Sequence, residues 1–155
     1  MQSDLIALCK SRGLTIGTAE SLTAGLVVSK LAEVPGASAV LRGGVVAYAT
    51  DVKHSVLGLD VTLLDHVVSE PVVTQMAIGA TRVLGTDLGL ATTGVAGPDA
   101  LDDQPPGSFW LAVHHAPSNT TMTKYAHIQG DRGYVREMAA RGVIALALEC
   151  LAGPN

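Results

Sequence analysis

Short apolar segments alternate with helical patterns along this 155-residue chain, and the alternation constrains the fold more than any other feature. Five segments are rich in β-branched or small apolar residues, which is typical of strands. They are residues 14–18, 43–49, 87–93, 108–114 and 120–127. Strands interspersed with helices favour an α/β fold, in which helices cover a central sheet.

The predicted helices are recognised by apolar periodicity together with residues that begin and end helices. They are residues 4–11, 26–32, 51–57, 69–84 and 132–151. Ser69 and Pro71 mark the start of the fourth, because serine is a favoured N-cap and proline fits the first turn. The last two strands are close enough in sequence to form a hairpin. We therefore expect a three-layer αβα sandwich with a mixed, mostly parallel central sheet, formed by residues 1–155 as a single domain.

The most informative polar segment is residues 18–25, TAESLTAG, which connects the first predicted strand to the second helix. The first N–H groups of a helix have no intrahelical partner, so they can hold an anion or the oxyanion of an acyl-transfer intermediate. Ser21 is therefore well placed to be a nucleophile. From this segment alone, the simpler alternative is that Ser21 is a helix N-cap.

Three loops are expected beyond the carboxyl ends of the strands, where ligands of α/β sheets bind. They are residues 18–25, 48–53 and 93–98. Their polar or small residues are Thr18, Glu20, Ser21, Thr23, Tyr48, Thr50, Asp51, Lys53, Thr93, Gly94, Ala96 and Gly97. The sequence predicts that these loops share one ligand site.

The composition argues against several classes of function. The formal net charge is -4 and no block of basic residues occurs, which speaks against nucleic acid as a partner. No apolar run is long enough to cross a membrane, and a cytoplasmic location is expected. Cys9 and Cys150 lack metal-ligand spacing, so we expect neither a metal nor a cofactor. The 48% hydrophobic and 15% charged composition favours a homo-oligomer.

A series of blocks, in order along the chain, resembles the CinA carboxy-terminal domain family. The blocks are residues 18–21, 46–53, 68–73, 76–80, 93–98, 106–107 and 130–132. The resemblance covers nearly the whole chain. It implies the family's best-described activity, hydrolysis of the carboxamide of nicotinamide mononucleotide to nicotinate mononucleotide and ammonia. The implied partner is thus a small pyridine mononucleotide.

The resemblance makes Ser21 the nucleophile, Lys53 its general base and Tyr48 a neighbour in the same proton network. A serine hydroxyl needs a base to become nucleophilic, and a serine–lysine pair is a known substitute for the serine–histidine–aspartate triad. Burial at the sheet edge would lower the pKa of Lys53 enough for it to act as a base. The N–H groups after Ser21 would stabilise the oxyanion.

Other residues are candidates for substrate contacts. Asp131 and Arg132 open the last helix and offer a site for the phosphate, although a cap and a solvated arginine explain them equally well. Glu20 either orients Lys53 or the substrate amide, or favours the start of the second helix. Arg42 precedes the strand that leads to Tyr48 and is either a cleft residue or a surface arginine.

The small residues of the third loop have two interpretations. Gly94, Ala96 and Gly97 would let the backbone approach the ribose or the nicotinamide ring, or they form a tight strand exit. Thr93 precedes them and is a further candidate.

The chain departs from the family pattern beside the serine. Leu22, Thr23, Ala24 and Gly25 stand where Cys-Thr-Gly-Gly is common, and the methyl of Ala24 is expected near the oxyanion site. Two alternatives to the deamidase therefore stay open. One is a non-catalytic nucleotide-binding or interaction module, and the other is an amidase for another small amide.

Overall fold

The computed structural model describes residues 1–153, which form a five-stranded sheet in the order β2-β1-β3-β4-β5. The strands are β1 (Ile16–Glu20), β2 (Leu41–Val46), β3 (Leu88–Gly94), β4 (Ser108–His115) and β5 (Thr120–His127). β1 pairs in parallel with β2 and β3, whereas β4 pairs antiparallel with both β3 and β5. The sheet is therefore mixed, as the predicted hairpin requires.

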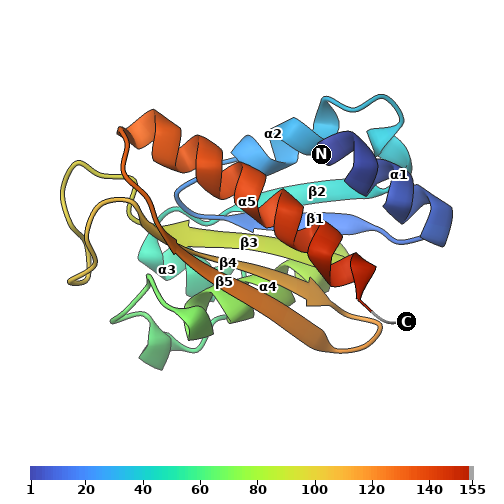
Figure 1. Ribbon diagram of the computed structural model, residues 1–155. Coiled ribbons are helices and arrows are strands. Elements are labelled where there is room, and N and C mark those ends of the chain that lie inside the picture. Colours follow the sequence, from blue (N-terminus) through green and yellow to red (C-terminus); the bar gives the residue numbers. More distant parts are fainter. Residues whose placement is uncertain (154–155) are drawn as a thin grey trace.

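Helices cover both faces of the sheet (Figure 1). One face carries α1 (Gln2–Arg12), α2 (Leu26–Ala32) and α5 (Arg132–Ala152), and the other carries α3 (Thr50–Ser55) and α4 (Glu70–Leu84). Two short 3-10 helices, Ala37–Ala39 and Val61–Leu63, lie in the connections. This arrangement confirms the predicted three-layer αβα sandwich. Among the residues described, no helix combines the length and the apolar character needed to span a membrane.

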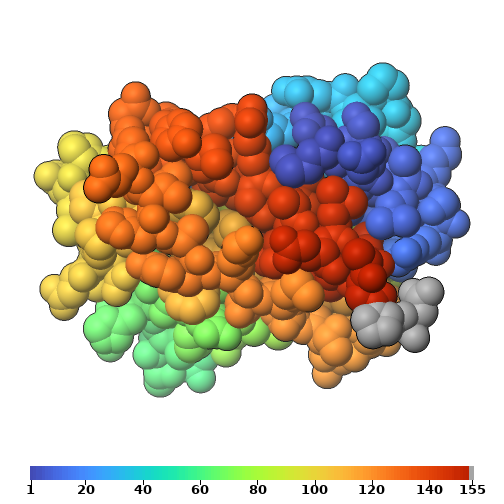
Figure 2. All heavy atoms as spheres, in the orientation of Figure 1, coloured from blue at the N-terminus to red at the C-terminus, as the bar shows by residue number. Residues whose placement is uncertain are grey.

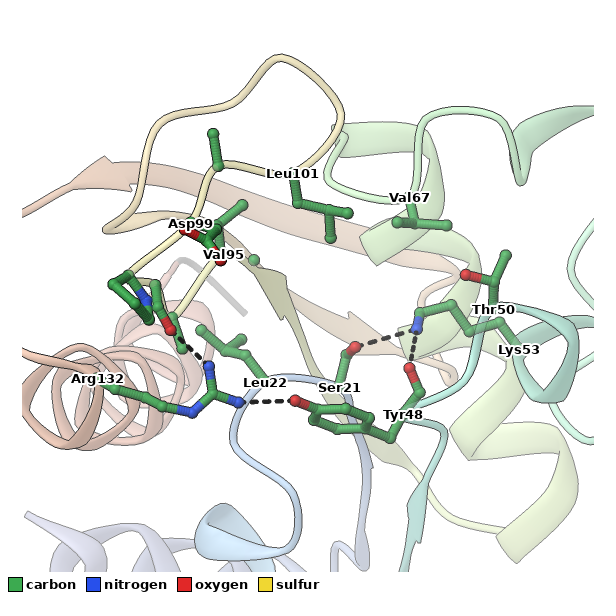
Figure 3. A pocket seen from close by; sticks show the side chains of 15 residues that line it. Ser21, Leu22, Tyr48, Thr50, Lys53, Val67, Val95, Asp99, Leu101 and Arg132 are labelled. Atoms are coloured by element: carbon green, nitrogen blue, oxygen red, sulfur yellow. Dashed lines mark hydrogen bonds between the residues drawn. The ribbon is translucent and has the colours of Figure 1, made fainter.

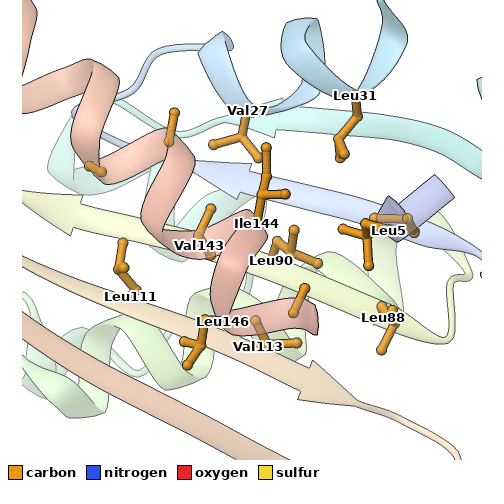
Figure 4. Close-up of a cluster of buried hydrophobic side chains, with 14 of the residues drawn as sticks. Leu5, Val27, Leu31, Leu88, Leu90, Leu111, Val113, Val143, Ile144 and Leu146 are labelled. Atoms are coloured by element: carbon orange, nitrogen blue, oxygen red, sulfur yellow. The ribbon is translucent and has the colours of Figure 1, made fainter. Parts of the chain in front are cut away.

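The two faces of the sheet are packed differently. Large side chains such as Leu88, Leu90 and Leu111 meet α5 on one face and form the main core (Figure 4). The other face presents small residues to α4, and a Cβ added at Gly89 would collide with the carbonyl oxygen of Ala77. Small side chains thus let α4 approach the sheet closely.

The ends of the long helices follow their sequence signals. Ser69 caps α4 by accepting a hydrogen bond from the Val72 N–H, and Gly85 ends the helix at φ 64°. Asp131 caps α5 by accepting a hydrogen bond from the Tyr134 N–H. In the space-filling view α5 crosses the front of the molecule between the yellow loop that follows β3 and the blue α1 (Figure 2).

The start of α2 differs from the prediction. A turn over residues 22–25 separates β1 from the helix, so Ser21 does not lie in the first turn of α2. Ala24 and Gly25 adopt left-handed backbone conformations, with φ 49° and 97°, to make this turn. The expected position of Ser21 over a helix N-terminus is therefore wrong.

The strand order places the loops that matter next to one another. From β1 the chain crosses first to β2 on one side and later to β3 on the other side. The connection that follows β1 and the one that leads to β3 therefore run in opposite directions across the sheet, and a crevice forms between the ends of β1 and β3. Ligands of α/β sheets bind at such topological switch points, at the carboxyl ends of the strands. Ser21 and Gly94 leave the sheet at this point.

Candidate active site

A pocket of about 390 Å³ opens at the carboxyl ends of β1, β2 and β3 (Figure 3). Four separate segments and one helix start contribute to its wall. The lining residues are Ser21, Leu22, Tyr48, Thr50, Lys53, Val67, Gly94, Val95, Ala96, Gly97, Pro98, Asp99, Ala100, Leu101 and Arg132. The three loops predicted from the sequence therefore do meet at one cavity.

Ser21 and Lys53 form the polar floor of this pocket. The Nζ of Lys53 lies 3.0 Å from the Oγ of Ser21. It also donates hydrogen bonds to two backbone carbonyls, of Ala47 at 2.8 Å and of Tyr48 at 3.3 Å. Helix α3 brings Lys53 back under the end of β2, so the side chain is only 1% exposed.

The surroundings of Lys53 favour its uncharged form. Within residues 1–153 no carboxylate forms an ion pair with it, and burial lowers its pKa from 10.5 to about 8. An uncharged amine has two N–H groups, which match the two carbonyls, and one lone pair, which can accept the proton of the Ser21 hydroxyl. The arrangement is thus that of a base facing a nucleophile.

Tyr48 and Arg132 meet on one side of the pocket. The Nη2 of Arg132 donates to the Tyr48 hydroxyl at 2.8 Å, and its Nη1 donates to the Gly97 carbonyl at 2.7 Å. The contact of Tyr48 with Lys53 is through the backbone carbonyl. The expected proton network of Ser21, Lys53 and the Tyr48 hydroxyl is therefore not formed, and Tyr48 instead orients Arg132.

Arg132 carries a positive charge into the pocket wall. Both of its hydrogen-bond partners are neutral oxygens, and it forms no ion pair within the described part of the chain. A guanidinium with only neutral partners retains its capacity to bind a bidentate anion.

The carboxylate of Glu20 lies at the N-terminus of α2, where the sequence predicted that an oxyanion would bind. Its side chain is fully buried and accepts hydrogen bonds from the N–H groups of Gly25, Val27 and Val28. The hydroxyls of Thr18 and Thr23 donate to the same carboxylate. The prediction that the start of α2 stabilises an oxyanion is wrong, because a carboxylate of the chain already binds there. Glu20 makes no contact with Lys53, so its helix-start interpretation is the one that the structure supports.

Several predicted contact residues do not line the pocket. Thr18, Glu20 and Thr23 are buried behind Ser21. Thr93 is buried as well and donates a hydrogen bond to the Val67 carbonyl. Gly94, Ala96 and Gly97 do line the cavity, as does Arg132.

The remaining predictions concern Arg42, Asp131 and Ala24. Arg42 lies near the start of β2, away from the pocket, and donates to the Leu84 carbonyl at the end of α4. Asp131 caps α5 without reaching the cavity. Ala24 is exposed on its turn and does not line the pocket, so the expectation of its methyl near the oxyanion site is wrong.

Sequence reasoning missed an apolar wall that faces the nucleophile. It consists of Leu22, Val67, Val95 and Leu101. These residues come from different loops and share no periodicity, so no pattern groups them. The nearest signal was that Val67 directly precedes the block at residues 68–73.

Comparison with known proteins decides the family. A family model described as the CinA C-terminal domain matches residues 1–151. The chain belongs to this family. A CinA-like protein of Frankia casuarinae is 41% identical over 100% of this chain and 36% of its own length. A putative competence-damage inducible protein of Levilactobacillus brevis is 45% identical over 81% of this chain and 30% of its own length. The chain thus spans about a third of these CinA relatives.

Solved structures of the CinA superfamily share the fold. A protein from Klebsiella pneumoniae superposes with a TM-score of 0.91 at 29% identity, over 98% of both chains. A superfamily protein from Escherichia coli gives a TM-score of 0.91 at 30% identity, over 96% of this chain and 87% of that chain. The five-stranded sandwich is therefore the fold of the CinA domain.

Proposed function

We propose that this CinA domain is an amidohydrolase that converts nicotinamide mononucleotide to nicotinate mononucleotide and ammonia. The contact of 3.0 Å between the buried Lys53 Nζ and the Ser21 Oγ carries the proposal. A lysine with a lowered pKa beside a pocket serine is an arrangement suited to acyl transfer, because it supplies nucleophile and base together.

The reaction follows from these two groups. Uncharged Lys53 takes the hydroxyl proton as Ser21 Oγ attacks the carboxamide carbon, which gives a tetrahedral oxyanion and a lysine ammonium. The ammonium then protonates the amide nitrogen, the C–N bond breaks, and ammonia leaves an acyl ester on Ser21. Water attacks this ester with Lys53 again as base, and the returned proton regenerates the Ser21 hydroxyl.

The backbone offers a donor for the oxyanion beside the nucleophile. The N–H of Ser21 itself is engaged by the Thr92 carbonyl at 3.1 Å, and the first N–H groups of α2 bind Glu20. The N–H of Leu22 has no acceptor within residues 1–153, and Leu22 lines the pocket. We assign the oxyanion to this N–H, because a preorganised donor at the developing charge is worth about 3 kcal/mol.

The pocket also fits the other parts of this substrate. Arg132 offers the guanidinium that a phosphate requires. The apolar side chains of Val67, Val95 and Leu101 suit the face of a pyridine ring. Asp99 is the one carboxylate among the lining residues, and its charge is complementary to the positive ring nitrogen of the oxidised nucleotide.

Release of ammonia from nicotinamide mononucleotide tests the proposal. The wild-type protein should turn over, and Ser21→Ala should abolish the release without loss of folded structure. Ser38→Ala is the matched control, because Ser38 is exposed and is not among the residues that line the pocket. Calorimetric binding of the nucleotide by the wild type with no ammonia released would instead support a non-catalytic binding module. Turnover of a different small amide alone would retain the chemistry and change the substrate.

A further inference from the structure

A fully buried carboxylate directly precedes the nucleophile. Glu20 is 0% exposed, and its Oε1 accepts from the Thr23 hydroxyl at 2.7 Å, the Val27 N–H at 2.8 Å and the Gly25 N–H at 3.1 Å. Its Oε2 accepts from the Val28 N–H at 3.0 Å and the Thr18 hydroxyl at 3.1 Å. Five neutral donors thus compensate this charge, and no cation does so within residues 1–153.

These donors define the turn that carries Ser21. Gly25 and Thr23 lie within it, and Val27 and Val28 are in the first turn of α2. The chain from 21 to 25 is therefore wrapped around the carboxylate. Two further contacts tie the turn to β3, since the Thr23 hydroxyl bonds to that of Thr92 at 2.8 Å and the Ser21 N–H donates to the Thr92 carbonyl at 3.1 Å.

The geometry points to Glu20 as a positioning residue for the nucleophile. Its carboxylate accepts hydrogen bonds from the turn over residues 21–25 and so fixes the conformation of this turn. The turn then holds the Ser21 Oγ within hydrogen-bond distance of the Lys53 Nζ. This inference rests on the proposed function, because it assigns Glu20 a role in the reactivity of Ser21. Lys53 itself is held by different groups, the carbonyls of Ala47 and Tyr48 after β2. Glu20 therefore positions Ser21 and does not position Lys53.

An amide in place of the carboxylate tests this assignment with little change in volume. In Glu20→Gln the oxygen can serve the three donors of the Oε1 position, and the NH₂ group then faces the Thr18 hydroxyl and the Val28 N–H. The hydroxyl can rotate to accept, whereas the N–H cannot. The substitution thus repels one backbone donor at the start of α2 and leaves the pocket lining intact.

Two readouts of Ser21 are measured in parallel. One is kcat and KM for ammonia release from nicotinamide mononucleotide, and the other is the rate at which a small fluorophosphonate modifies Ser21. In Glu20→Gln both kcat and the modification rate should fall about 10²-fold, the effect of a nucleophile misplaced by about 1 Å. KM should stay within about threefold of wild type, because binding groups are untouched. The pH midpoint should not move, because the burial that lowers the pKa of Lys53 and its two carbonyl contacts are unchanged.

Glu33→Gln is the matched control, since Glu33 is an exposed glutamate at the end of α2, and it should retain both rates. Glu20→Asp keeps the charge and should recover part of the loss. A Glu20→Gln protein that melts earlier yet retains both rates would overturn the inference and leave Glu20 as a structural cap. A raised KM with unchanged kcat would overturn it as well.

The two readouts separate this inference from the proposed function. If fluorophosphonate modifies wild-type Ser21 but no ammonia is released, the proposed substrate fails and the modification rates still decide the role of Glu20. If wild-type Ser21 reacts in neither assay, both fail. Should Glu20→Gln not fold, Thr23→Val removes a single donor from the carboxylate. It should slow the modification of Ser21, and an unchanged rate would overturn the assignment.

Discussion

Two buried charged side chains flank Ser21, and they are satisfied to different degrees. Glu20 accepts five hydrogen bonds, one from the Thr18 hydroxyl in β1 and four from the turn and helix that follow it. Lys53 has three neutral oxygens around its ammonium, one of which is the Ser21 hydroxyl itself. Both side chains are 1% exposed or less, yet they form no ion pair with each other.

The difference in hydrogen bonding gives the two side chains different roles. Glu20 stabilises the local backbone, whereas Lys53 can exchange a proton with Ser21. The carboxylate has a full set of donors, so its ionised form organises the backbone around it. The ammonium loses hydration without gaining a counter-ion, and burial lowers its pKa to about 8. Burial of Lys53 therefore costs folding stability and leaves an amine that can act as a base. The hydrogen bonds to Glu20, in contrast, hold the backbone of the turn in place.

The largest expected effect is on catalysis at Lys53. Lys53→Met keeps an unbranched apolar stem that is one atom shorter and removes the base, so ammonia release should fall about 10³-fold, within the range of general-base contributions. A steady-state ammonia assay at pH 8 measures it. Lys10→Met changes an exposed lysine of α1 and should have no effect. A Lys53→Met protein with more than a tenth of wild-type kcat would show that Lys53 is not the general base.

The two charges should respond with opposite signs in stability. Glu20→Leu strands buried donors that each cost about 1–3 kcal/mol, so the free energy of unfolding should fall by about 3 kcal/mol or more. Lys53→Met should leave the stability unchanged or raised at pH 7, because the folded state disfavours the ammonium there. This penalty is present in full below about pH 8, declines as the pH rises from about 8 to 10.5, and is absent above that.

Urea denaturation of both variants at pH 7 measures this contrast. Stability losses of equal size in Glu20→Leu and Lys53→Met would show that the degree of hydrogen bonding does not distinguish the two sites.

The smallest expected effect is at Arg132. This charged side chain is exposed, so it shows what a charge in the pocket contributes when it is not buried. Arg132→Gln should raise the KM for the mononucleotide about tenfold, since a charge-assisted hydrogen bond contributes about 1.5–3 kcal/mol. kcat should be nearly retained, because Arg132 is not bonded to Ser21 or Lys53. The nucleoside that lacks the phosphate is the control substrate. An equal rise in KM for both substrates would contradict phosphate binding by Arg132.

Sequence reasoning predicted the fold well because alternating strands and helices leave few ways to bury their apolar faces. The resemblance to the CinA family placed Ser21, Tyr48 and Lys53 in one site, and the pairing of β1 with β2 is what brings their loops together in the structure. Strand β2 runs over Leu41–Val46 rather than 43–49, because pairing with β1 sets its limits and apolar content does not.

The errors in the site have a common physical origin. The sequence of segment 18–25 predicts a direct strand-to-helix connection, whereas the carboxylate of Glu20 stabilises a separate turn within it. Local patterns do not show that a side chain will bond to the backbone eight residues further on. The apolar wall escapes sequence reasoning for a similar reason, because Val67 and Leu101 are far apart in the sequence and line the same pocket only in the folded chain. The predicted homo-oligomer stays a prediction.

The pKa of Lys53 in the folded protein tests the central claim most directly. An NMR titration of ¹³C-labelled lysine methylene groups, with Lys53→Met used to assign the signal, follows this one side chain through its protonation. The account predicts a midpoint at about 8, well below the 10.5 of an ordinary lysine. A midpoint near 10.5 would mean that the ammonium stays charged beside Ser21 at neutral pH, and the proposed base would not exist.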